Sequence, residues 1–134
     1  MPFSHLPDVI APSMVLVTLG FGVAVLCLLN VLISLVEGVT LTLLKWNAFP
    51  RSLLASLLVN TISSLAGGVL LIILQDTPPV WILITLLLSI LIEGLVLLKL
   101  QPTAGRRTWL FSIAANLSSY LIIILPAYLI SLRQ

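Results

Sequence analysis

Charged residues are scarce in this chain of 134 residues: Asp, Glu, Lys and Arg make up 7% of it, against 60% hydrophobic residues. A soluble domain carries about 25% charged residues, so this chain cannot cover a water-facing surface with charge. Its formal net charge of +2 is also too small, and its basic residues too scattered, for a nucleic-acid interface. We therefore expect membrane lipid, and no nucleic acid, against its surface.

Cysteine and histidine each occur once, as Cys27 and His5. A single cysteine excludes an intrachain disulfide and a paired-cysteine redox motif. One histidine cannot form a zinc site, which needs three or four ligands, and it lies too far from the polar residues for a Ser/His/Asp triad. We expect no metal site and no catalytic residues, and the sequence identifies no cofactor.

Four long apolar runs predict an all-α membrane protein with four transmembrane helices. Spanning a membrane takes about 20 apolar residues, and the runs cover residues 13–44, 52–74, 80–100 and 108–132. None alternates as a strand does, and only helices or closed barrels satisfy their backbone in lipid. A proline-rich arm, residues 1–12, is expected at the membrane interface, residues 75–79 predict a turn, and Pro126 predicts a kink.

One polar series occurs twice, at an offset of 56 residues (37 to 93). Glu37-Gly38 returns as Glu93-Gly94, and without a gap the further pairs are Arg51 and Arg107, Ser56 and Ser112, Asn60 and Asn116, and Ser63 and Ser119. Matches between leucines are common by chance in so apolar a chain, so these polar matches are the informative ones. They predict two similar helical hairpins, residues 13–74 and 80–134, arranged as a parallel repeat about an axis along the membrane normal.

Basic residues mark one end of both hairpins: Lys45, Arg51, Lys99, Arg106 and Arg107 flank the two connections within them. Cytoplasmic loops carry an excess of Lys and Arg. These residues therefore predict cytoplasmic hairpin tips, with the N- and C-termini on the non-cytoplasmic side. Trp46 and Trp109 are expected at the cytoplasmic interface and Trp81 at the opposite one. The localisation that follows is multi-pass, in a prokaryotic inner (plasma) membrane.

Helical spacing places the polar residues of each hairpin on one face and at one depth. Steps of four and three, which keep one face of a helix, separate Ser56, Asn60 and Ser63, and again Ser112, Asn116 and Ser119. At a rise of about 1.5 Å per residue, Glu37 and Asn60 each lie about 12–13 Å from the hairpin tip. We expect Glu37 level with Asn60, and Glu93 level with Asn116.

A carboxylate at the bilayer centre costs about 2.5–3.5 kcal/mol on insertion scales, so Glu37 and Glu93 require an explanation. One interpretation is structural: a protonated Glu hydrogen-bonded to the level Asn, with Ser and Asn holding helices together. The other is a polar site that faces the bundle interior or a partner. If the two carboxyl groups meet, like-charge repulsion favours sharing one proton. Whether they form one site or two stays open at this point.

Two functional hypotheses follow. The first is a non-catalytic subunit or scaffold of a larger membrane complex, whose duplicated Glu/Asn site contacts a partner helix, a lipid or a cofactor. The second is a small oligomeric proton- or cation-coupled transporter or channel that uses Glu37 and Glu93. The expected protein partners are thus other membrane subunits or further copies of this chain. A membrane enzyme that uses the two carboxyls as acid and base is a third, weaker hypothesis.

Overall fold

The computed structural model describes residues 12–74, 78–131 and 133, and all elements in this part are helical. They are α1 (Pro12–Leu43), α2 (Phe49–Leu74), α3 (Pro78–Leu100), the short 3-10 helix η1 (Pro102–Ala104), α4 (Arg107–Ser119), the π-helical turn η2 (Tyr120–Ile124) and α5 (Leu125–Ser131). α1, α2, α3 and the continuous run α4–η2–α5 are each long and apolar enough to cross a membrane. The prediction of a multi-pass protein with four transmembrane helices is confirmed to that extent.

Two helices begin before the apolar runs predicted for them, and prolines explain both. α2 begins at Phe49 instead of Ser52, and α3 begins at Pro78, inside the predicted turn. Pro50, Pro78 and Pro79 thus lie in the first turns of helices, where a missing backbone N–H leaves no hydrogen bond unmade. The rest of the predicted turn, residues 75–77, and residues 1–11 of the predicted arm lie outside the described residues.

Pro126 has a different effect on the fourth transmembrane helix. The chain forms a π-helical turn over Tyr120–Ile124, directly before α5, and the backbone N–H of Leu125 bonds to the carbonyl of Tyr120. A proline ring clashes with the carbonyl four residues earlier in a regular α-helix, and a widened turn relieves that clash. The structure therefore places a π-helical turn where the sequence predicts a kink.

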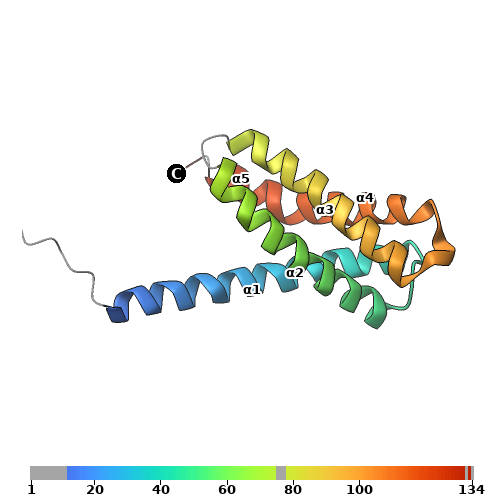
Figure 1. The fold of residues 1–134 in the computed structure, drawn as a ribbon, viewed down its shortest axis with the longest axis horizontal. Coiled ribbons are helices and arrows are strands. Elements are labelled where there is room, and N and C mark those ends of the chain that lie inside the picture. The colour runs from blue at the N-terminus through green and yellow to red at the C-terminus, as the bar shows by residue number, and fades with distance from the viewer. Residues whose placement is uncertain (1–11, 75–77, 132, 134) are drawn as a thin grey trace, which may run out of the picture.

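The helices pack as a four-membered bundle in which α1 and α3 each contact both α2 and α4. The connections within the two hairpins, residues 44–48 and 101–106, lie together at one end of the bundle, which we call the tip end (Figure 1). The end of α5 lies at the opposite end of the bundle (Figure 1). There α1 diverges from the other helices, and its N-terminal half extends away from the bundle (Figure 1).

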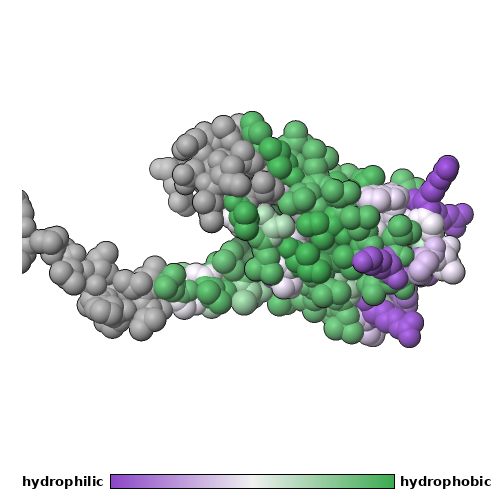
Figure 2. Space-filling model, viewed as in Figure 1, coloured by the Kyte–Doolittle hydropathy of each residue, from purple (hydrophilic) through white to green (hydrophobic). Residues whose placement is uncertain are grey.

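The interior of the bundle is more polar than its surface. In the described part, eleven polar or charged side chains are buried, against six hydrophobic ones. Leu, Ile and Val dominate the exposed surface, and hydrophilic side chains gather at the tip end (Figure 2). This is the reverse of a soluble domain, and it suits a bundle surrounded by lipid.

The three tryptophans do not all lie as an aromatic belt would place them. Trp46 is near the tip end, but its ring is only 5% exposed and packs in a hydrophobic cluster with Leu41 and Leu97. Trp46 thus lies near the end of the bundle where the sequence predicts it, but the neighbouring hairpin covers its ring, so the ring is not exposed as in an aromatic belt. Trp109 is half-buried, and the side chain of Trp81 lies outside the described part.

Candidate functional site

Glu37 on α1 lies in the bundle interior, where 1% of it is exposed. Its Oε2 accepts a hydrogen bond from Nδ2 of Asn60 on α2. The same amide nitrogen lies 3.3 Å from Ser34 Oγ, and that hydroxyl donates to the Asn30 carbonyl at 2.7 Å. The predicted common level of Glu37 and Asn60 is confirmed. Arg51 is exposed at the tip end, so the carboxyl group relies on neutral partners.

Glu93 on α3 makes the corresponding contact with α4. It is also 1% exposed, and its Oε2 accepts a hydrogen bond from Nδ2 of Asn116. That nitrogen lies 3.0 Å from the Ser112 carbonyl, and Ser112 Oγ donates to the Ile90 carbonyl at 2.7 Å. Each hairpin therefore carries a Glu–Asn pair that joins its two helices at one level, as the spacing predicts.

Ser119 on α4 joins the two pairs across the bundle. Its Oγ donates to Glu37 Oε1 at 2.7 Å, and the same oxygen lies 3.0 Å from the Asn116 carbonyl. The hydroxyls of Thr40 and Ser118, 2.9 Å apart, add a second hydrogen bond between α1 and α4. The two predicted polar levels thus form one continuous buried layer, and the open question of one site or two is answered as one.

The two halves of this layer are not equivalent. Ser63 occupies in the first hairpin the position of Ser119 in the second, but its Oγ donates only to the carbonyl of Asn60 in its own helix, at 3.3 Å. In the described part, Glu93 Oε1 has no hydrogen-bond partner, and Ser56 Oγ has none either. One carboxyl oxygen in the layer therefore has unused hydrogen-bonding capacity.

Glycines next to both Glu residues allow the helices of each hairpin to approach closely. A Cβ on Gly38 would lie 3.0 Å from the Leu53 Cα, and a Cβ on Gly94 would overlap the ring of Trp109. Leu53 and Trp109 are themselves 56 residues apart, the offset of the sequence repeat. Each Glu-Gly pair thus combines a polar contact to the partner helix with the short interhelical distance that the contact requires.

The structure buries all eight residues predicted for the polar site: Glu37, Asn60, Ser56, Ser63, Glu93, Asn116, Ser112 and Ser119. It exposes the five predicted basic anchors, Lys45, Arg51, Lys99, Arg106 and Arg107. The sequence reading missed Thr40, Ser118 and the bond from Tyr120 Oη to Thr85 Oγ1, 3.2 Å long. Tyr120 could have been found, because it directly follows Ser119 and a phenol in lipid needs a partner.

The chemical capacity of the layer is set by two carboxyls, two amides and several hydroxyls. Among the described residues, no group of three or more His, Cys, Asp or Glu comes together as a metal site would require. The layer can hold and exchange protons, and its donors and acceptors can link helices. Comparisons with known protein families, characterised proteins and solved structures find no match for this chain.

Proposed function

We propose that this chain is a non-catalytic subunit of a larger membrane complex, and that the N-terminal half of α1 is its main contact with another subunit. One observation carries the proposal: every residue from Leu19 to Leu29 is exposed. Eleven residues make about three helical turns, so no face of this segment is buried against the other residues that the structure describes. Phe21 and Leu26 are 72% and 67% exposed.

The length of α1 supports the same proposal. α1 has 32 residues and α3 has 23, which correspond to about 48 Å and about 35 Å at about 1.5 Å per residue. The hydrocarbon core of a bilayer is about 30 Å thick. Without a partner, lipid alone would have to cover the part of α1 that extends beyond the neighbouring helices. A second transmembrane subunit packed along α1 would cover it, and small residues such as Gly20 and Ala24 permit close packing there.

In this proposal the buried polar layer holds the bundle together and orients α1 for its partner. Both Glu side chains are 1% exposed, so the outer surface offered to a partner is apolar. The two hairpins are duplicated units with tips in the cytoplasm of a prokaryotic cell. Support comes from the matching Glu–Asn contacts at an offset of 56 residues and from exposed basic residues at the tip end.

Site-specific photo-cross-linking tests the subunit proposal. A benzophenone analogue of phenylalanine replaces Phe21, and a control carries it at Leu121, which is 61% exposed on the packed part of the fourth transmembrane helix. Irradiation in native membranes should give one discrete heavier protein product from position 21 and far less from position 121. Only lipid adducts from both positions would refute the proposal, and a product of two identical chains would favour the second candidate.

The second candidate is an oligomeric proton- or cation-coupled transporter or channel. It is favoured by the two carboxyls in one continuous layer and by the unpartnered Oε1 of Glu93, because a group with spare hydrogen-bonding capacity can accept a proton or a cation. Flux into liposomes should then be lost in Glu93→Gln and Glu37→Gln. A matched control that keeps both Glu residues is Ser56→Ala, which removes a hydroxyl that has no partner among the described residues. Flux that survives both glutamine variants would rule this candidate out.

A further inference from the structure

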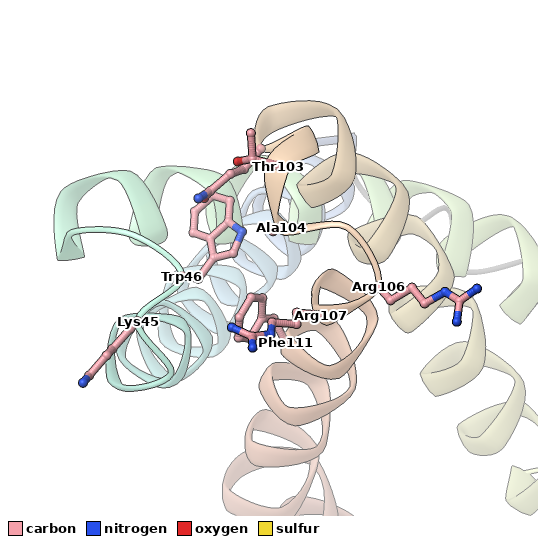
Figure 3. A pocket seen from close by; sticks show the side chains of 8 residues that line it. Lys45, Trp46, Thr103, Ala104, Arg106, Arg107 and Phe111 are labelled. Atoms are coloured by element: carbon pink, nitrogen blue, oxygen red, sulfur yellow. The ribbon is translucent and has the colours of Figure 1, made fainter.

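A pocket of about 350 Å³ opens between the two hairpin tips, away from the Glu–Asn layer. Trp46 lines it from the first hairpin, and Gln101, Arg107 and Phe111 line it from the second. Figure 3 shows the Trp46 ring and the Arg107–Phe111 pair on either side of the space. Its volume is within the range of about 300–1,000 Å³ that is usual for small-ligand sites.

Two of the residues that line this pocket carry a buried polar atom that has no partner within the described part. Trp46 is 5% exposed, and its indole Nε1, a donor only, makes no hydrogen bond within the described residues. Gln101 Oε1, an acceptor, is also buried without a partner. Figure 3 shows the Trp46 indole nitrogen directed into the space between the tips. Buried polar groups nearly always have partners, so the pocket lacks one hydrogen-bond acceptor and one donor.

The charge around the pocket has one sign. Arg107 lines it, and Lys45 and Arg106 lie at its rim, where their side chains point away (Figure 3). The acidic residues that the structure describes, Glu37 and Glu93, are both buried within the bundle. The cations at the described tip end thus have no acidic side chain to neutralise them, and an anion is the complementary ligand.

We propose that this pocket binds a phosphate group, carried by a phospholipid headgroup or free in solution. The Arg107 guanidinium and the Trp46 indole N–H donate to phosphate oxygens, and Gln101 Oε1 accepts from a hydroxyl on the same ligand. The pocket lies where the transmembrane helices end, the depth at which basic pockets between helices meet lipid headgroups. The site is independent of the partner surface on α1 and of the Glu–Asn layer.

Native mass spectrometry of the delipidated chain tests the site with three probes: phosphatidylglycerol, phosphatidylcholine and inorganic phosphate. The phosphatidylglycerol headgroup supplies both the anionic phosphate and the hydroxyl. We expect it to bind more tightly than phosphatidylcholine, which has no headgroup donor. If inorganic phosphate binds tightly by itself, the site is assigned to the free anion. If phosphatidylglycerol binds tightly and inorganic phosphate does not, the site is assigned to lipid.

Variants separate this site from general attraction to a basic surface. Arg107→Gln should weaken binding of the tightest probe about tenfold, and Trp46→Phe, which keeps an aromatic ring and removes the donor, about fivefold. Lys99→Gln is the matched control, since Lys99 is a basic residue of the same end that does not line the pocket. The proposal would be overturned if all three substitutions weakened binding equally. It would also be overturned if Trp46→Phe, shown to be folded by circular dichroism, bound the probe as tightly as the wild type.

Discussion

Ser119 and Ser63 provide the sharpest test of the polar layer, because they hold the same position in the two hairpins but differ in their contacts. Ser119 Oγ donates to Glu37 Oε1 at 2.7 Å across the bundle, whereas Ser63 Oγ reaches only a carbonyl of its own helix. Their exposed fractions, 1% and 7%, are similar. Replacing each with Ala removes one hydroxyl and almost no packing, so the difference in stability reports the interhelical bond.

The expected magnitude follows from the partner that is left behind. Hydrogen bonds between membrane helices average about 0.6 kcal/mol and reach about 1.7 kcal/mol, and a buried acceptor that loses its donor costs about 1–3 kcal/mol. Ser119→Ala leaves Glu37 Oε1 without that donor, so we expect a loss of about 1–1.5 kcal/mol in the free energy of unfolding. Ser63→Ala should cost about 0.5 kcal/mol or less, since its bond lies within one helix.

Reversible unfolding by sodium dodecyl sulfate in mixed micelles, followed by circular dichroism, measures both values. A shifted midpoint with an unchanged slope identifies a change in stability. In a double-mutant cycle with Glu37→Leu, Ser119→Ala should show a coupling energy of about 1 kcal/mol and Ser63→Ala none. Equal losses for the two serines, or no coupling between Ser119 and Glu37, would refute a layer joined across the bundle.

Two further predictions concern the helix contacts on either side of the layer. Gly38→Ala should destabilise the bundle by about 1–3 kcal/mol, because its Cβ would lie 3.0 Å from the Leu53 backbone. Gly22→Ala in the same helix is the control, since its Cβ would meet nothing within 4 Å. Similar unfolding midpoints for the two variants would contradict this contact. Asn116→Ala, at a 2%-exposed position bonded to Glu93, should lower the midpoint clearly more than Asn30→Ala, whose partner Thr61 is exposed. The reverse order would show that burial does not strengthen these bonds.

Local spacing in the sequence was sufficient to determine the spans and the pairing within each hairpin. The bilayer thickness sets the minimum length of an apolar run that can span it, and the depth of Glu37 and Asn60 follows from counting residues away from a shared tip. Steps of three and four placed Ser56 and Ser63 on the buried face with Asn60, and all three are buried. The exposed basic residues could be predicted for the same reason, since charge cannot enter lipid cheaply.

Only the tertiary structure decided how the two hairpins meet. The bond from Ser119 to Glu37 joins residues 82 positions apart. Ser63 holds the equivalent position in the first hairpin, yet among the described residues it bonds to the Asn60 carbonyl of its own helix and not to Glu93. The choice depends on the relative placement of whole helices, which no local periodicity encodes. The same holds for the burial of Trp46 between the tips, for the pocket beside it, and for the divergence of α1 from the bundle. The spacing within the sequence therefore determined the Glu–Asn contact of each hairpin, and packing between the hairpins made the surroundings of the two contacts differ.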